Sequence, residues 1–255
     1  MISFVGAGPG DPDLITIKGR RLLEEADIII WAGSLVSPEH LKFAKETCET
    51  FDSKSMTLED VIEVMERGTE EGKKIVRLHT GDPTIYGAIR EQIDELDRLG
   101  ITYEVVPGVS SFTAAAAAIN REFTLPSVSQ TVILTRNEGR TPVPLGEELE
   151  SLAAHKASMA IFLSVQDIDS VVEKLIKGYG SEDVPVAVVF KATWPDEEVL
   201  FGTLGDISQK VKEANITKMS QILVGNFIEG EYELSKLYDK TFTHKFRKGI
   251  DESSN

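Results

Sequence analysis

Cysteine is nearly absent from the 255-residue sequence, which contains only Cys48. A single thiol excludes an intramolecular disulfide, and it excludes zinc or iron–sulfur sites that depend on several cysteines. The four histidines are scattered without the spacing of metal ligands. We therefore expect no protein-bound metal. A free thiol fits a reducing compartment, so we expect a cytoplasmic protein.

Positive charge is also scarce, because 27 Lys and Arg residues face 42 Asp and Glu residues and give a formal charge of −15. Such an acidic chain is a poor partner for nucleic acid or for an anionic membrane. No apolar run approaches the roughly 18 residues of a membrane-spanning helix. The first six residues lack the basic region of a signal peptide and have the pattern of a strand. An anionic substrate would need a local cluster of cations.

Short apolar runs alternate with helical periodicity in the first half of the chain. The expected strands are residues 2–5, 28–31, 74–78 and 102–106, and the expected helices are 16–25, 85–99, 110–120 and a capped helix that begins at Thr57. This alternation predicts a largely parallel sheet connected by helical crossovers.

The rhythm changes after a break near residues 123–127. Further strands are expected at 131–134, 158–163, 185–190, 199–203 and 221–226, and helices at 166–177 and 204–214. We interpret this half as a second α/β domain with a mixed sheet. The predicted domains are 1–125 and 126–240, followed by a tail at 241–255.

Three Gly- and Pro-rich turns follow expected strands of the first half, at residues 6–11, 80–87 and 107–111. The first fails as a dinucleotide fingerprint, because Asp11 stands where the third glycine is needed and prolines delay the helix. Strand-end turns on one edge of a parallel sheet can together form a ligand cleft. Asp82 and Ser110 keep two interpretations, capping of the following helix or contact with a ligand.

These turns and several later motifs resemble the tetrapyrrole methylase family over residues 1–230. The motifs are Val-Gly-Ala-Gly-Pro-Gly-Asp-Pro at 5–12, Thr-Gly-Asp-Pro at 80–83, Val-Pro-Gly-Val-Ser-Ser at 106–111, Ala-Ile-Phe-Leu at 160–163, Ala-Thr-Trp-Pro at 192–195 and Phe-Gly-Thr-Leu at 201–204. The resemblance implies two α/β domains, S-adenosylmethionine in a trough between them, and a homodimer.

One loop indicates the branch of that family. Thr-Arg-Asn-Glu-Gly-Arg-Thr-Pro-Val-Pro at 135–144, with the tail from 235 to 247, resembles the enzymes that methylate C11 of precorrin-4 or of its cobalt form. The resemblance implies that a tetrapyrrole such as cobalt-precorrin-4 is converted to the corresponding precorrin-5 in cobalamin biosynthesis. The alternatives are methylation of another precorrin or of uroporphyrinogen-III, and a non-catalytic protein that binds S-adenosylmethionine.

The resemblance also implies site residues. The cofactor-binding positions are Pro9, Thr80, Gly81, Asp82, Ile85, Ser110, Ser111, Leu163 and Ala192. Arg136 and Arg140 are the expected substrate-binding residues, since Arg binds carboxylates through two parallel hydrogen bonds. In the alternative interpretation, these two arginines are solvated charges of a loop and bind no ligand. His79 either faces the cleft or has a structural role at a strand end, Trp194 either flanks the tetrapyrrole or packs, and no general base is assigned.

Overall fold

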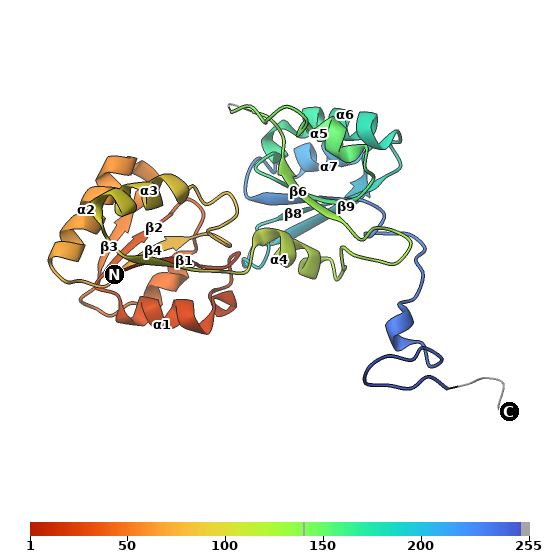
Figure 1. Cartoon of the computed structure of the whole chain (residues 1–255). Helices are drawn as coiled ribbons and strands as arrows, with labels where there is room; N and C mark the ends of the chain where they lie inside the picture. Colours follow the sequence, from red (N-terminus) through yellow and green to blue (C-terminus); the bar gives the residue numbers. More distant parts are fainter. Residues whose placement is uncertain (140, 251–255) are drawn as a thin grey trace. The chain divides into compact units, whose positions relative to one another are not determined.

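The computed structural model describes residues 1–139 and 141–250. The chain divides into two compact units, which are described separately (Figure 1). The first contains Met1–Ala115 and Lys191–Glu198, and the second contains Ala116–Phe190 and the chain from Val199 onward. The predicted domain limits, 1–125 and 126–240, place the boundary later in the chain and do not include the return of Lys191–Glu198 to the first unit. As boundaries of folding domains they remain a prediction.

The first unit is built on a five-stranded sheet. Its strands are β1 (Ile2–Gly6), β2 (Ile28–Trp31), β3 (Glu49–Asp52), β4 (Ile75–His79) and β5 (Tyr103–Val106), in the order β3-β2-β4-β1-β5. Every pairing is parallel, which confirms the predicted sheet type. The carboxyl ends of β1, β4 and β5 therefore share one edge of the sheet, and the three Gly-rich turns follow those ends.

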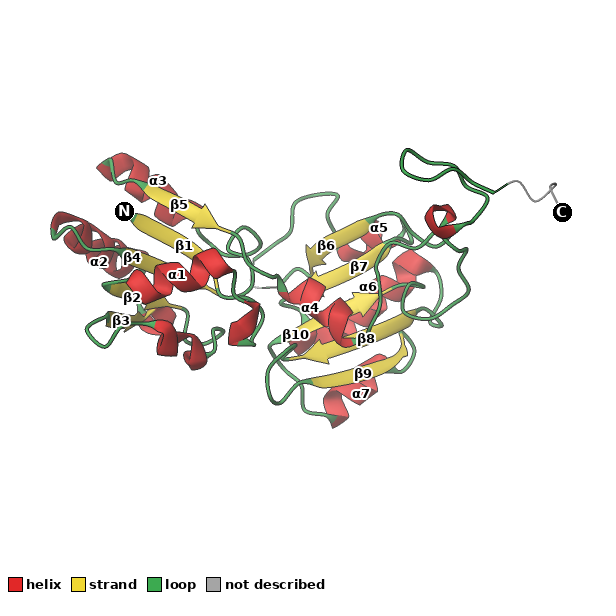
Figure 2. Cartoon of the chain, turned by 90° about the horizontal axis from the view of Figure 1, so that it is seen from below, coloured by secondary structure: helices red, strands yellow, loops and turns green. Residues whose placement is uncertain are grey.

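Helices cover both faces of this sheet (Figures 1 and 2). They are α1 (Ile17–Glu25), α2 (Leu58–Glu70) and α3 (Arg90–Leu99). Phe4 packs with α2 and α3, whereas the adjacent Val5 packs with α1. Because both faces are buried, the inner strands β1 and β2 are mainly apolar without polar alternation, whereas two residues of the edge strand β3 are exposed. The cap predicted at Thr57 forms a reciprocal pair with Asp60.

The prediction of a helix over 85–99 is wrong at its first turn, because α3 begins at Arg90. Tyr86 and Ala88 have φ values of 54° and 49°, in the left-handed region that ends a right-handed helix. Gly87 lies so close to Pro83 that a Cβ on it would be 2.0 Å from the Pro83 carbonyl oxygen. The segment 83–89 is therefore a compact turn.

The second unit has a mixed sheet, as predicted. Its strands are β6 (Val132–Arg136), β7 (Ser158–Phe162), β8 (Pro185–Phe190), β9 (Glu198–Thr203) and β10 (Ser220–Val224), in the order β6-β7-β10-β8-β9. β6 and β7 are parallel, so Arg136 and Phe162 are register partners at neighbouring strand ends. β10 runs antiparallel to β7 and β8.

The described part of this half of the chain contains four α-helices. They are α4 (Ser111–Ala118), α5 (Leu149–Ala153), α6 (Ile168–Tyr179) and α7 (Ile207–Glu213). Residues of α5, α6 and α7 share one hydrophobic core with the sheet. The boundary between the two units falls within α4, after Ala115. The sequence did not predict α5, because a helix of 5 residues is too short to show helical periodicity.

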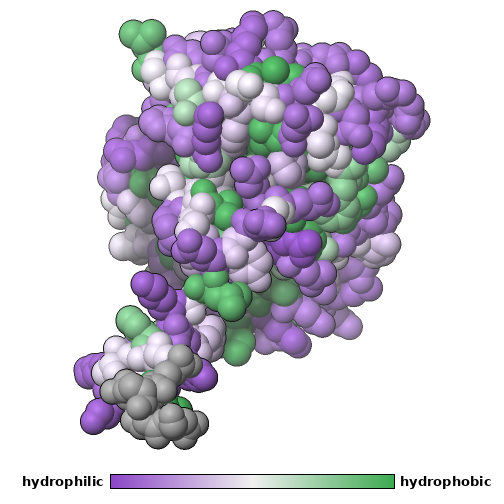
Figure 3. Space-filling view, turned by 90° about the vertical axis from the view of Figure 1, so that its right-hand side faces the viewer, coloured by the Kyte–Doolittle hydropathy of each residue, from purple (hydrophilic) through white to green (hydrophobic). Residues whose placement is uncertain are grey.

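The segment after β10 has few regular elements and exposes many apolar side chains, among them Leu234, Tyr238, Phe246 and Ile250. Arg247 closes it into a hook by donating from Nη2 to the carbonyl oxygens of Leu237 and Asp239. Figure 3 shows this segment beside a surface dominated by hydrophilic side chains. Part of the predicted tail, residues 251–255, lies outside the described residues. None of the described helices is long and apolar enough to cross a membrane.

Candidate functional site

Backbone hydrogen bonds join the turns at the carboxyl ends of β1 and β4. The Ala7 amide donates to the His79 carbonyl at 2.7 Å. The Gly81 amide donates to the Gly8 carbonyl at 2.8 Å, and the Gly8 amide donates back to the Gly81 carbonyl at 3.3 Å. The two turns thus continue the sheet beyond its strands and form one rigid edge.

The third turn packs against the other two at glycines. A Cβ on Gly108 would lie 2.1 Å from the Gly81 carbonyl oxygen, and a Cβ on Gly6 would lie 2.6 Å from the Gly108 Cα. Gly81 also has a φ of 60°, which favours glycine. No larger residue fits at Gly6 or Gly108 without separating the turns.

Asp82 connects the second turn to the third. Its Oδ1 accepts from the Thr84 amide at 2.8 Å and from the Thr84 hydroxyl at 2.6 Å, and its Oδ2 accepts from the Gly108 amide at 3.2 Å. The carboxylate thus stabilises its own turn instead of the start of a helix. A carboxylate has about four acceptor positions, so it keeps capacity for one further donor.

The segment that contains Ala192 closes over the first turn. Thr193 Oγ1 accepts from the Asp11 amide at 3.0 Å, and Trp194 Nε1 donates to the Pro9 carbonyl at 2.9 Å. Lys191 and Thr193, on either side of Ala192, have φ values of 47° and 69°. A positive φ is strained for a β-branched residue such as Thr, and such strain is concentrated at functional sites.

The buried side chain of His40 also contacts this edge, a role that the sequence did not indicate. Its side chain is fully buried, with Nε2 2.8 Å from the Ala7 carbonyl oxygen and Nδ1 3.0 Å from the Ser37 carbonyl oxygen. The imidazole therefore ties the first turn to the segment Pro38–Phe43.

His79 is buried in the first unit, which agrees with the structural interpretation. Its ring stacks on Phe4 with centroids 6.1 Å apart, and Nε2 has no hydrogen-bond partner within residues 1–139 and 141–250. Burial, with the adjacent positive charge of Arg77, lowers the pKa of His79 to about 3. Burial also lowers the pKa of Arg77, to about 10. A neutral, enclosed His79 is a poor general base for a reaction in solvent-accessible space.

In the second unit, the features of interest follow β6 and β7. Leu163 directly follows β7, with a φ of 53° and 59% of its surface exposed. An exposed leucine in a left-handed conformation has no packing explanation, and it stands at a predicted cofactor position. Next to it, the Ser164 hydroxyl donates to the Phe162 carbonyl and accepts from the backbone amide of Asn137 at 2.8 Å.

The loop after β6 folds around Arg136. Nη1 donates to the carbonyl oxygens of Asn137 and Thr141 at 3.2 and 3.1 Å, and Nη2 donates to that of Pro142 at 2.8 Å. The guanidinium thus closes the loop by binding carbonyls at both of its ends. The other predicted substrate residue, Arg140, lies outside the described residues.

A family model described as Tetrapyrrole (Corrin/Porphyrin) Methylases matches residues 1–208. The chain belongs to the tetrapyrrole methylase family. The match spans both units, and it contains the three turns, Leu163, Ala192 and the loop after β6.

Individual tetrapyrrole methylases match nearly the whole chain. The cobalt-precorrin-4 C(11)-methyltransferase of Methanocaldococcus jannaschii is 56% identical over 97% of this chain and 96% of its own length. The precorrin-4 C(11)-methyltransferase of Pseudomonas aeruginosa is 46% identical over 97% and 99%. A solved cobalt precorrin-4 methyltransferase has a TM-score of 0.88, with 47% identity, 90% coverage of this chain and 96% of its own.

The fold groups most of the predicted cofactor positions of this tetrapyrrole methylase. Pro9, Thr80, Gly81, Asp82, Ser110 and Ala192 lie on the joined turns or on the segment over them, Ile85 lies in the turn before α3, and Ser111 begins α4. Leu163 lies on the second unit. Their role in cofactor binding, and the trough between domains, remain predictions. The described residues contain no group of three or more His, Cys, Asp or Glu side chains placed to hold a metal ion.

Proposed function

We propose that this chain is an S-adenosylmethionine-dependent methyltransferase that methylates C11 of cobalt-precorrin-4 to give cobalt-precorrin-5 in cobalamin biosynthesis. The main support is the 56% identity, over 97% of the chain, to a protein named for that reaction. The sequence of the loop at 135–144 adds support, because it resembles the loop of the enzymes that methylate C11 of precorrin-4 or its cobalt form.

The joined turns of the first unit fit the cofactor chemically. They offer backbone amides and carbonyls on a rigid edge, and Asp82 keeps one acceptor position for a hydroxyl or a cation. We assign cofactor binding to Pro9, Thr80, Gly81, Asp82, Ile85, Ser110, Ser111, Leu163 and Ala192. S-adenosylmethionine supplies an electrophilic methyl group on a sulfonium, which a nucleophilic ring carbon accepts without a covalent enzyme intermediate.

The residues of the chain then contribute binding and alignment. Holding two reactants in line can lower a barrier by roughly 7–11 kcal/mol, so no side chain needs to act as a nucleophile. Arg136 and Arg140 are proposed to bind substrate carboxylates, which an acidic chain would otherwise repel.

Three finer points complete the proposal. The substrate carries cobalt on arrival, so the metal is part of the substrate and not of the protein. The protein forms a homodimer, as the family resemblance implies, and it acts in the cytoplasm without nucleic acid or membrane partners.

The test is a mass-detected assay with S-adenosylmethionine and either cobalt-precorrin-4 or its metal-free form. A gain of one methyl group on the cobalt form alone is the expected result. A gain on the metal-free form alone would overturn the cobalt assignment but keep the branch. No gain on either form, with the cofactor still bound, would favour another precorrin, uroporphyrinogen-III or a non-catalytic binding protein.

A further inference from the structure

Arg136 uses only part of its hydrogen-bonding capacity to close its own loop. Three of its five N–H groups bind the carbonyls of Asn137, Thr141 and Pro142. The remaining donors are on Nε and Nη2, two nitrogens that share one edge of the planar guanidinium. Among the residues that the structure describes, Nε has no hydrogen-bond partner. This edge matches the two oxygens of a carboxylate.

The residue that follows Arg136 is anchored to α6 through its side chain. Asn137 is 6% exposed, and its side-chain Oδ1 accepts from Lys174 Nζ at 2.9 Å. Its Nδ2 faces Asp167 Oδ2 at 3.5 Å and Ser170 Oγ at 3.4 Å, which are weak contacts. Lys174 is therefore the main partner of the Asn137 side-chain amide.

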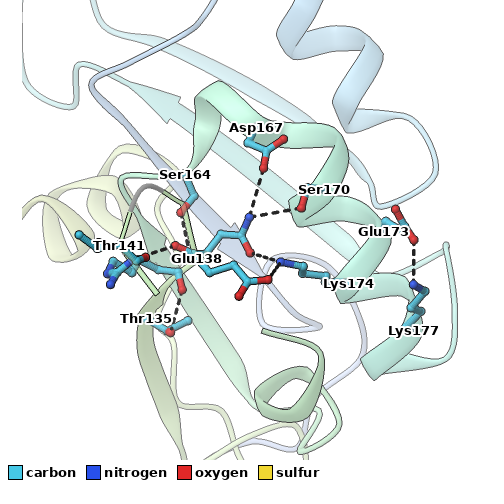
Figure 4. A network of polar contacts seen from close by, with 11 residues as sticks. Thr135, Glu138, Thr141, Ser164, Asp167, Ser170, Glu173, Lys174 and Lys177 are labelled. Atoms are coloured by element: carbon cyan, nitrogen blue, oxygen red, sulfur yellow. Dashed lines mark hydrogen bonds and ion pairs between the residues drawn. The ribbon is translucent and has the colours of Figure 1, made fainter. Parts of the chain in front are cut away.

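Lys174 holds a second residue of the same loop. Its Nζ donates to Glu138 Oε1 at 2.7 Å, and this ion pair lowers the pKa of Glu138 below its usual value. Figure 4 shows Lys174 reaching from α6 toward the loop and binding there. Only 24% of the Lys174 side chain is exposed, so this contact is shielded more than most surface ion pairs of the chain.

Ser164 connects the anchored loop to the neighbouring strand end. Its hydroxyl accepts a hydrogen bond from the backbone amide of Asn137. Ser164 directly follows Leu163, the predicted cofactor position of this unit. The loop after β6 is thus fixed at two points, on α6 by Lys174 and on the end of β7 by Ser164. Both fixed points act on Asn137 and Glu138, the two residues that follow Arg136.

We propose that Lys174 is a positioning residue for tetrapyrrole recognition. Through Asn137 and Glu138 it holds residues 136–139 of the loop so that the Nε–Nη2 edge of Arg136 faces a carboxylate of the substrate. The proposal rests on the proposed function in one respect, namely that the ligand of this loop is a tetrapyrrole polycarboxylate. Lys174 itself does not contact the ligand.

The chain offers a matched control on the same helix. Lys177 pairs with Glu173 at 2.7 Å, but both belong to α6, and more than half of each side chain is exposed. Figure 4 shows Lys177 beyond Lys174 on α6, with a dashed line to Glu173. Lys174→Met and Lys177→Met therefore remove the same charge from one helix and keep an unbranched side chain, and only the first removes an anchor of the loop.

The experiment compares binding of uroporphyrin, a stable tetrapyrrole polycarboxylate, and of S-adenosylmethionine to the full chain and its variants. We expect Lys174→Met to weaken uroporphyrin binding by about 10-fold or more, which is the loss of one well-placed charged hydrogen bond. The affinity for S-adenosylmethionine should change by less than about 2-fold, since Asn137 and Glu138, which Lys174 binds, are not among the proposed cofactor-binding residues. Lys177→Met should match the unmodified chain for both ligands, and Lys174→Arg should restore most of the uroporphyrin affinity.

Three results would overturn the proposal. They are unchanged uroporphyrin affinity in Lys174→Met, an equal loss of both affinities together with a lower melting temperature, and no uroporphyrin binding by the unmodified chain. Failure of the proposed function looks different, because there the unmodified chain binds uroporphyrin and Lys174→Met weakens it, yet neither form of precorrin-4 gains a methyl group.

Discussion

The two units organise their strand ends in different ways. In the first unit, three turns are joined backbone to backbone, with Gly6, Gly81 and Gly108 in contact and one carboxylate, Asp82, between them. In the second unit, the loop after β6 is held by side chains, mainly those of Arg136 and Lys174. The first arrangement leaves no space for a Cβ at Gly6 or Gly108. The second depends on individual side-chain hydrogen bonds, so we expect a substitution there to have a smaller effect. The difference predicts where substitutions abolish function and where they tune it.

The largest effect is expected for Gly108→Ala. The new Cβ would lie 2.1 Å from the Gly81 carbonyl oxygen and 2.8 Å from the Gly6 Cα, and both are backbone atoms that cannot move aside. We expect about 3 kcal/mol or more of lost stability and a loss of S-adenosylmethionine binding. Urea unfolding and calorimetric titration would measure both. A variant of unchanged stability would show that the turns are not packed as described.

The next effect tests whether a side chain also supports the backbone-built edge. His40→Ala removes a fully buried ring and both of its contacts with carbonyl oxygens, including that of Ala7. The expected loss is about 2–4 kcal/mol, from a cavity and an unsatisfied carbonyl. Chemical denaturation followed by circular dichroism gives the number, and a loss under about 0.5 kcal/mol would contradict the assigned role.

A third effect appears only as the pH falls below 6.5, the ordinary pKa of a histidine. The pKa of His79 is about 3 in the folded chain, against an ordinary value of 6.5. Between these values the unfolded chain binds more protons, so the free energy of unfolding falls as the pH decreases from 6.5 toward 3. One group contributes at most about 1.4 kcal/mol per pH unit.

Replacing His79 with leucine should make that decline shallower in the same window, because the group that titrates is gone. Unfolding free energies of both proteins measured at several pH values would show this. Parallel curves would mean that other groups carry the whole dependence.

The smallest effect is expected for Gly139→Ala, in the side-chain-built loop. A Cβ there meets nothing within 4 Å, in contrast to Gly108. Stability should change by less than about 0.5 kcal/mol, as for most surface substitutions. Thermal melts of Gly139→Ala and Gly108→Ala, measured side by side, test the contrast between the two units. Similar decreases in melting temperature for both variants would contradict it.

Apolar strands and the helices between them were predictable from the sequence because their patterns are local. The strand at Ile28–Trp31 and the cap at Thr57 match their predictions. Glu49–Asp52 was missed because an edge strand with two exposed residues lacks an apolar run. The start of α3 was placed too early, since nothing in the residue types of Tyr86 and Ala88 signals a positive φ.

For the candidate site, the sequence predicted which turns meet but not what holds them. Glycines at strand ends carry a local signal, and parallel pairing brings those ends together. The contacts of His40 with Ala7 and of Lys174 with Asn137 join residues 33 and 37 positions apart. Such pairs depend on the tertiary fold, and His40 and Lys174 each look like ordinary residues of a helical segment.

The double fixation of the loop after β6 bears on the design of enzymes with new substrates. A transplant of residues 135–144 into another protein of the same fold would carry Arg136 and Asn137, but not the lysine of α6 or the hydroxyl after β7 that hold them. Without Lys174 and Ser164 the transplanted segment would keep its residues and lose its shape. The minimal portable module is therefore discontinuous in the chain, with one loop and two distant single residues.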